Sequence, residues 1–261
     1  MGNASLFDLL VESRKRLYHR GFNLWGATAI DDYDAVQCRG RRFRDRDESS
    51  RSVIVIGSGG RALWEHLEGK GQANGNRAHR GYHPIDEFSR EVIDAEASRL
   101  EAAGLEACTV YPFDPRPVNF IKLAESAGLG VVSPVVPFLL HPDFGPWVSL
   151  RGALVLAEPV PPSAELVDFD SCTGCAAPCL TACPVSVYGP GGEAHLDRCA
   201  GHRHSGGCAT GCDVRRVCPV GSEHRYGVEE ETFRHSYSLA TLRRWYGLGM
   251  WRFVPRRLRR R

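Results

Sequence analysis

The chain has 261 residues, 43% of them hydrophobic, and a formal net charge of +2. This length and composition fit an ordinary globular protein with one sizeable core and a smaller module. They exclude a membrane span, since no run approaches roughly eighteen apolar residues, and Asp8 and Glu12 interrupt the first apolar stretch, where a signal peptide is continuously apolar. We therefore expect a cytoplasmic protein.

The first part of the chain mixes helical and strand patterns. Apolar residues at helical spacing predict a helix over residues 4–20, and residues 84–105 carry the clearest helical pattern in the chain. Residues 22–30 and the β-branched run at residues 52–56 predict two strands between these helices.

The same mixture continues to residue 157. Residues 118–126 predict a short helix, and three further strands are expected at residues 107–113, 137–140 and 148–157. Helices and strands that mix in this way indicate an α+β fold in which helices cover a sheet.

A proline-rich segment at residues 158–162 breaks any regular element and marks a domain boundary. The residues that follow contain many cysteines and too few apolar side chains for a core of their own. We expect a first domain over residues 1–165, a cysteine-rich module over 166–228, and an amphipathic segment with an Arg-rich tail over 229–261.

Eight of the ten cysteines form two groups that each end in Cys-Pro, with the spacings C-x2-C-x3-C-x3-C-P and C-x8-C-x3-C-x5-C-P. In the bacterial ferredoxin run C-x2-C-x2-C-x3-C-P, three thiolates bind one 4Fe-4S cluster and the fourth, before proline, binds the other cluster. The same crossing predicts two ligand sets here. The first quartet is Cys172, Cys175, Cys179 and Cys218, and the second quartet is Cys183, Cys199, Cys208 and Cys212.

Two other uses of these cysteines stay open at this point. An even number permits a disulfide framework, although a cytoplasmic chain disfavours one. Four cysteines can also hold structural zinc, but such sites pair two C-x2-C knuckles, which differ from this four-cysteine string. The pattern favours two clusters and therefore single-electron transfer. Cys38 and Cys108 lie outside both groups, and we expect them to be buried as small hydrophobic residues.

Six sequence blocks resemble the epoxyqueuosine reductases and reductive dehalogenases. Those of the cysteine-rich module read Ser-Cys-Thr-Gly-Cys, Leu-Asp-Arg-Cys and Gly-Cys-Asp, at residues 171–175, 196–199 and 211–213. Those of the first domain read Phe-Asp-Pro-Arg-Pro, Ala-Gly-Leu-Gly and Leu-His-Pro-Asp-Phe-Gly-Pro-Trp, at residues 113–117, 127–130 and 140–147. The last of these also resembles the cobalamin-processing protein CblC, a relative without clusters.

The resemblance implies a nitroreductase-like α/β sandwich domain that binds cobalamin, followed by a ferredoxin-like double 4Fe-4S module that delivers electrons to its cobalt. By the same match Asp114 corresponds to a general acid. The cofactor-binding residues would be His141, Trp147, Gly128, Gly130 and Arg116. The residues themselves also allow a turn at Asp114 and at His141, and a core position for Trp147.

The sequence departs from the family at three places in particular. Ser133-Pro134-Val135 replaces a Gly-Lys-Asn, and Phe120 replaces a glutamate, which puts the epoxyqueuosine substrate in doubt. Arg215 stands where the family has a cysteine, so that Cys208 would have to supply the missing thiolate.

The function that the resemblance implies is a cobalamin-dependent iron-sulfur reductase with an external low-potential electron donor and a small or nucleoside-like substrate. A cobalamin-processing protein and a ferredoxin-type electron carrier are the alternatives. Arg-rich runs at residues 39–44 and 243–261 could hold the phosphates of a nucleic acid, but the composition favours a solvated loop and a disordered tail.

Overall fold

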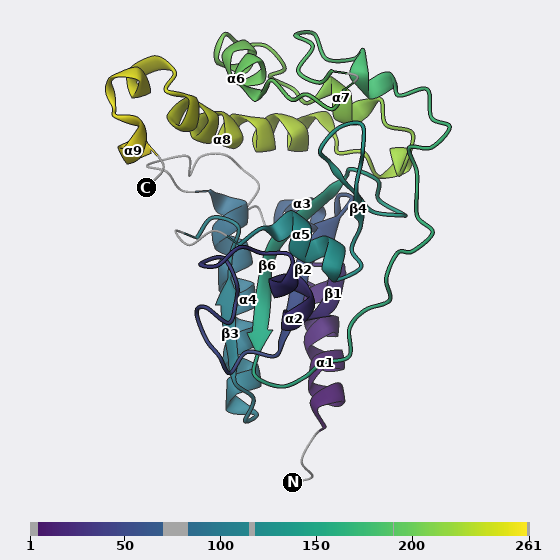
Figure 1. Ribbon diagram of the computed structural model, residues 1–261, viewed down its shortest axis with the longest axis vertical. Helices are drawn as coiled ribbons and strands as arrows, with labels where there is room; N and C mark the ends of the chain where they lie inside the picture. Colours follow the sequence, from purple (N-terminus) through teal and green to yellow (C-terminus); the bar gives the residue numbers. More distant parts are fainter. Residues whose placement is uncertain (1–4, 70–82, 115–117, 190, 260–261) are drawn as a thin grey trace. The chain divides into compact units, whose positions relative to one another are not determined.

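The computed structural model describes residues 5–69, 83–114, 118–189 and 191–259 (Figure 1). The chain divides into two compact units. Unit 1 contains Met1–Val131 and Val148–Phe169, and unit 2 contains Val132–Trp147 and Asp170–Arg261. Residues 132–147, which the sequence predicts to be part of the first domain, thus belong to the unit that holds the cysteine-rich module. No described helix is long and apolar enough to cross a membrane.

Unit 1 is built on a four-stranded antiparallel sheet with the order β1-β2-β6-β3. The strands are β1 (Leu24–Ala29), β2 (Ser52–Gly59), β6 (Val148–Leu156) and β3 (Ala107–Val110). Strand β2 is buried along its whole length, because strands flank both of its edges and helices cover both faces of the sheet. The mixed α/β architecture predicted from the sequence is confirmed.

Two glycines show how closely the helices approach the sheet. A Cβ atom on Gly152 of β6 would lie 2.8 Å from Ile93 of α4 (Pro84–Ala102). One on Gly26 of β1 would lie 2.3 Å from the carbonyl oxygen of Ala127, which follows α5 (Phe120–Ser126). Gly26 pairs with Val55 of β2, and Gly152 pairs with the next residue of β2. Successive residues of a strand face opposite sides of the sheet, so the two glycines lie on opposite faces. Helices α4 and α5 therefore cover opposite faces.

The remaining helices of unit 1 are α1 (Leu6–Tyr18), α2 (Ile30–Ala35) and α3 (Ala62–Gly69). Helix α1 begins with a capping box, in which the Ser5 hydroxyl accepts from the Asp8 N–H and the Asp8 carboxylate accepts from the Ser5 N–H. The predicted helices and strands all lie near their expected positions. The strand expected at 137–140 is reduced to β5 (Leu139–Leu140), which pairs with β4 (Val131–Val132).

Unit 2 has short elements and one long helix. The short elements are η2 (Pro178–Leu180), α6 (Leu196–His204), α7 (Asp213–Arg216), η3 (Ser222–His224), η4 (Gly249–Phe253) and α9 (Arg256–Arg259). The long helix α8 (Val228–Tyr246) has three glutamates in its first turn and two arginines in its last, which suits the helix dipole. Gly247, at φ +66°, ends it in the left-handed region. Helix α8 contacts α6 and supports the cysteine-bearing loops (Figure 1).

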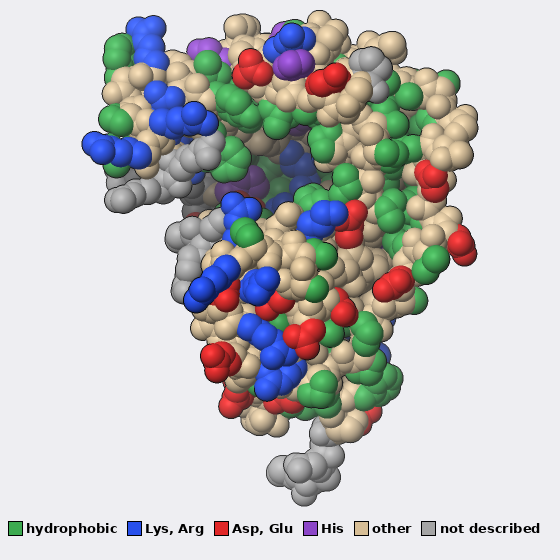
Figure 2. Space-filling model, viewed as in Figure 1, with side chains coloured by type: hydrophobic (Ala, Val, Ile, Leu, Met, Phe, Trp, Pro, Cys, Tyr) green, Lys and Arg blue, Asp and Glu red, His purple; other side chains and the backbone are tan. Residues whose placement is uncertain are grey.

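The C-terminal segment after α8 carries exposed hydrophobic and Arg side chains together (Figure 2). Met250 is 86% exposed and Phe253 is 75% exposed, with the Arg252 guanidinium 4.6 Å from the centre of the Phe253 ring. The other Arg-rich run is less free, because the Asp34 carboxylate accepts from the N–H groups of Phe43 and Arg44 and fixes that loop.

One expectation about the cysteines is wrong. Cys38 and Cys108 are both exposed rather than buried. Cys108 lies on β3, the edge strand of the sheet formed by the described residues. Hydrophobic character alone therefore did not determine where these two side chains lie.

Candidate functional site

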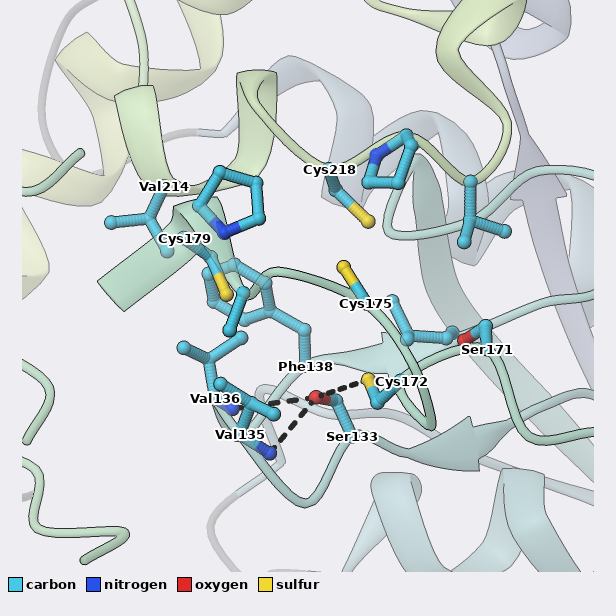
Figure 3. Close-up of a pocket in the computed structure, with 15 residues that line it drawn as sticks. Ser133, Val135, Val136, Phe138, Ser171, Cys172, Cys175, Cys179, Val214 and Cys218 are labelled. Atoms are coloured by element: carbon cyan, nitrogen blue, oxygen red, sulfur yellow. Dashed lines mark hydrogen bonds between the residues drawn. The ribbon is translucent and has the colours of Figure 1, made fainter. Parts of the chain in front are cut away.

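The first quartet lines one pocket in unit 2. Figure 3 shows the four sulfur atoms turned toward a common space. The rest of the wall is almost entirely apolar, and its main side chains are Val135, Val136, Phe138, Leu140, Val214 and Val220. Burial raises the pKa of the Cys179 and Cys218 thiols, and the charges of neighbouring thiols in the same quartet raise both further. The four thiols are thus close enough to interact.

The pocket accommodates the extra residue between Cys175 and Cys179. Ala177 adopts a left-handed conformation at φ +50°, and the short helix η2 begins directly after it. This conformation is uncommon for a residue with a Cβ atom. The left-handed turn takes up the inserted residue and returns the Cys179 side chain to the pocket.

Ser133 forms a hydrogen bond with the first quartet. Its hydroxyl oxygen lies 3.2 Å from the sulfur of Cys172, and it accepts from the N–H groups of Val135 and Val136 at 3.1 and 3.3 Å. A hydroxyl has two acceptor sites and one proton. Because backbone donors use the acceptor sites, the proton points to the sulfur and Ser133 donates to Cys172.

The second quartet also comes together, with Cys199 in α6 and the other three cysteines in the segments around it. Burial raises the pKa of the Cys199 and Cys208 thiols, and other thiols of the second quartet raise both further. Tyr188 lies beside this quartet. Burial raises the pKa of its phenol to about 12, and the charges of three thiols of the second quartet contribute to the rise. In every case the interacting thiols belong to one quartet, the same division that the ferredoxin spacing predicts.

Helix α8 holds the Cys208 loop in place. Cys208 has a left-handed backbone at φ +49°, and its carbonyl oxygen lies 2.9 Å from Nδ1 of His235. Burial, followed by the charge of Arg203, lowers the pKa of His235 to about 4. The ring is therefore neutral at pH 7, and Nδ1–H donates to the carbonyl. The Arg203 guanidinium in turn donates to the His235 carbonyl at 2.6 Å.

The two quartets are connected by aromatic side chains. Phe138 lines the pocket of the first quartet and packs edge-on against Tyr188, with ring centres 6.1 Å apart. The ring of Tyr188 reaches the second quartet. Within the described residues, no three His, Cys, Asp or Glu side chains are grouped as ligands of a single metal ion.

Asp114 lies in unit 1, in the turn after β3. One carboxylate oxygen accepts from the Tyr111 N–H at 2.8 Å, and the other forms an ion pair with Arg90 at 3.2 Å. The Arg90 guanidinium also lies 4.3 Å from the centre of the Tyr111 ring. These contacts fit the turn role that the sequence left open, and they leave the carboxylate one-quarter exposed.

His141 and Trp147 lie in unit 2. The His141 ring accepts from the N–H groups of Asp143 and Phe144 through Nδ1, and burial lowers the pKa of this histidine. The neutral ring therefore carries its proton on Nε2, which can donate to a ligand. Trp147 is fully buried against Tyr226, with ring centres 5.1 Å apart.

Gly128 and Gly130 lie in unit 1, after α5. Gly128 has φ +69° and its N–H donates to the Glu125 carbonyl, so it ends the helix. A Cβ atom at Gly128 would lie 2.4 Å from the Ala164 carbonyl oxygen. Gly130 has φ +153°. Arg116 lies outside the described residues.

Sequence reasoning missed the side chains around the quartets. Ser133, Phe138, Tyr188 and His235 come from four different segments, and no spacing rule relates them to the cysteines. The one available signal was that Ser-Pro-Val at residues 133–135 departs from the family pattern. In the structure Ser133 lies beside Cys172.

No protein-family model matches the sequence, and no curated protein matches it either. Among solved structures the chain is similar to a selenomethionine-labelled epoxyqueuosine reductase, with a TM-score of 0.61, 16% identity, and coverage of 87% of this chain and 69% of that one. A second epoxyqueuosine reductase, solved with a tRNA stem loop, gives a TM-score of 0.58 at 17% identity, with the same coverage.

A reductive dehalogenase described with a mechanism for B12-dependent dehalogenation gives a TM-score of 0.53 at 16% identity. This match covers 87% of the chain but only 33% of the dehalogenase. The resemblance inferred from the sequence blocks is confirmed: the chain shares the fold of the epoxyqueuosine reductases and reductive dehalogenases.

Proposed function

We propose that this protein is an iron-sulfur oxidoreductase whose two quartets hold two 4Fe-4S clusters and serve a corrinoid that reduces a small or nucleoside-like substrate. When bound, the clusters would supply single electrons and the corrinoid cobalt the reducing chemistry at the substrate. The observation that carries the proposal is the assembly of eight cysteines into two groups of four within one unit.

The donor set of the first quartet suits a 4Fe-4S cluster. Four thiols face a shared space, and the valine and phenylalanine side chains around them limit access of water. An apolar shell and hydrogen bonds to the sulfurs are the features by which a protein adjusts the reduction potential of such a cluster. Ser133 supplies one such hydrogen bond, to Cys172.

The second quartet is held by the interactions of α8. The neutral His235 ring fixes the backbone of Cys208, the cysteine that would replace the ligand lost at Arg215. Arg203 places a positive charge near three thiols of this quartet, which favours their thiolate forms. Only thiolates bind iron, so both contacts favour the state that a cluster requires.

The substrate side of the proposal rests on the fold. Asp114 is the candidate proton donor, since its carboxyl is partly exposed and would serve a reduction in which oxygen leaves as water. His141 offers its Nε2–H as a hydrogen-bond donor to the corrinoid. Similarity to an epoxyqueuosine reductase solved with a tRNA stem loop supports a nucleoside-like substrate and an RNA that carries it.

The test starts with the full chain purified and reconstituted without oxygen. We expect about eight irons and about eight acid-labile sulfides per chain from the ligand count. We also expect a change in the visible spectrum when cobalamin is added, and reduction of an epoxyqueuosine-containing tRNA stem loop or of the free nucleoside.

The outcomes separate the alternatives. Full iron content without any spectral change would leave a ferredoxin-type electron carrier. Cobalamin binding and reduction without turnover of either substrate would favour a cobalamin-processing protein. Zinc in place of iron, or thiols joined as disulfides, would overturn the proposal altogether.

A further inference from the structure

Arg215 lies between the two quartets along the chain. It belongs to α7, which joins Cys212 of the second quartet to Cys218 of the first. Its guanidinium lies over three aromatic rings, 5.7 Å from the centre of Phe138, 5.8 Å from Trp147 and 6.0 Å from Tyr226. The half-buried side chain is therefore held against rings.

The positive charge of Arg215 has no carboxylate partner among the described residues. The neighbouring Arg216 differs, since it forms ion pairs with Glu231 and Asp213. The Nε atom of Arg215 is buried without a hydrogen-bond partner in the described part of the chain. A half-buried cation with no ion-pair partner, and with one buried N–H left without an acceptor, is costly unless another negative charge lies nearby.

Aromatic side chains link this cation to both quartets. Phe138, which Arg215 covers, lines the pocket of the first quartet. Tyr188, which packs on Phe138, lies beside the second quartet and is close enough to Arg215 for its charge to act on the phenol. Four thiolates around an iron-sulfur core leave a net negative charge, and each electron that enters increases it.

Resting on the proposed function, we propose that Arg215 is the internal counter-charge of both clusters and raises their reduction potentials. Reduction adds negative charge, and a fixed cation in a medium of low dielectric constant stabilises the reduced form. Arg215 acts through the clusters and does not contact the substrate. This role accounts for a cation at a position where the resembling family has a cysteine.

The experiment compares the wild type with R215Q and R215K, each reconstituted as the full chain, by redox titration followed by electron paramagnetic resonance. R215Q should keep about eight irons. The reduction equilibrium of at least one cluster should become about tenfold less favourable, which lowers the midpoint potential of a one-electron couple by about 59 mV. R215K should keep a midpoint near that of the wild type. R198Q is the matched control, because Arg198 adjoins Cys199 but is exposed, and solvent screens its charge.

An R215Q protein with full iron and an unchanged midpoint potential would overturn the role of Arg215 but not the proposal that the protein binds two clusters. A wild type without iron would instead overturn the proposed function. If R215Q loses iron, the R215K variant decides between the two roles. Full iron and a midpoint potential equal to that of the wild type would support the counter-charge. Loss of iron in R215K, or a midpoint about 59 mV below that of the wild type, would instead assign Arg215 to packing.

Discussion

The Ser133 hydroxyl donates a hydrogen bond to the sulfur of Cys172, with 3.2 Å between the oxygen and the sulfur. The direction of this bond follows from the two backbone N–H groups that occupy the acceptor sites of the hydroxyl. Ser133 comes from the segment that joins β4 to β5, and Cys172 begins the cysteine-rich module. The interaction therefore ties a connecting loop to the first proposed ligand.

We expect Ser133→Ala to lower the reduction potential of the first cluster, because a hydrogen bond to a ligand sulfur stabilises the added electron. The shift should be at most about tenfold in the reduction equilibrium, or about 59 mV. Ser133→Thr, which keeps the hydroxyl, is the control. Redox titration of both variants measures the effect, and equal potentials in all three proteins would show that the bond is irrelevant to the cluster.

The two quartets can be emptied separately. Cys179→Ser removes a ligand of the first quartet and Cys208→Ser one of the second, so each variant should retain about four of about eight irons. Cys108→Ser changes an exposed cysteine outside both quartets and should retain all of them. Iron and sulfide analysis after reconstitution measures the content. Full iron in either quartet variant would contradict the ligand assignment.

Asp114 is predicted to donate a proton during turnover. Asp114→Asn should reduce the turnover number by about 10²-fold to 10⁴-fold without changing the iron content. Arg90→Gln removes the ion pair with Asp114 but keeps the carboxyl, so it should retain most of the activity. Steady-state kinetics without oxygen provides the measurement. Similar losses in both variants would assign Asp114 to the turn.

Gly128 allows a test of backbone geometry in unit 1. Gly128→Ala combines a left-handed φ with a Cβ atom 2.4 Å from the Ala164 carbonyl oxygen. Gly104→Ala has a positive φ too, but apart from its chain neighbours no described residue comes within 4 Å of the new Cβ. The control should therefore lose about 1 kcal/mol of unfolding free energy, and Gly128→Ala about 2 to 4 kcal/mol. Urea titration measures both, and equal losses would exclude the close contact.

Glu96 makes the stability of unit 1 depend on acid. Burial favours the neutral carboxyl, but the hydrogen bonds from Arg16 and Arg99 and the charge of Arg16, at 2.9 Å, oppose it, and the pKa of Glu96 lies below its ordinary value. The folded state thus holds the proton less tightly than the unfolded state. The carboxylate stabilises the fold above the ordinary pKa, and this contribution is lost as the pH falls through the folded pKa.

Glu96→Gln should accordingly lower the free energy of unfolding at pH 7 by about 2 kcal/mol and flatten its decline below pH 5. Glu12→Gln breaks an exposed ion pair with Lys15 and is the control, expected to leave the transition unchanged. Thermal unfolding across a pH series provides the data. A decline as steep as that of the wild type would mean that Glu96 is not responsible.

The sequence by itself determined the mixed α/β architecture and the positions of most helices and strands, and it predicted the division of eight cysteines into two groups of four. These features are local, because apolar periodicity, β-branched runs and the Cys-Pro spacing each depend on residues near one another in the chain. The blocks from residue 113 to residue 213 likewise led to the family whose fold the chain shares.

Only the tertiary structure decided which side chains surround the cysteines. Ser133 reaches Cys172 across 39 positions, His235 reaches Cys208 across 27, and Phe138 meets Tyr188 between the quartets. It also showed Cys38 and Cys108 to be exposed, and it placed the Arg215 guanidinium against three rings. Contacts of this kind depend on how distant segments pack, and no local pattern encodes them.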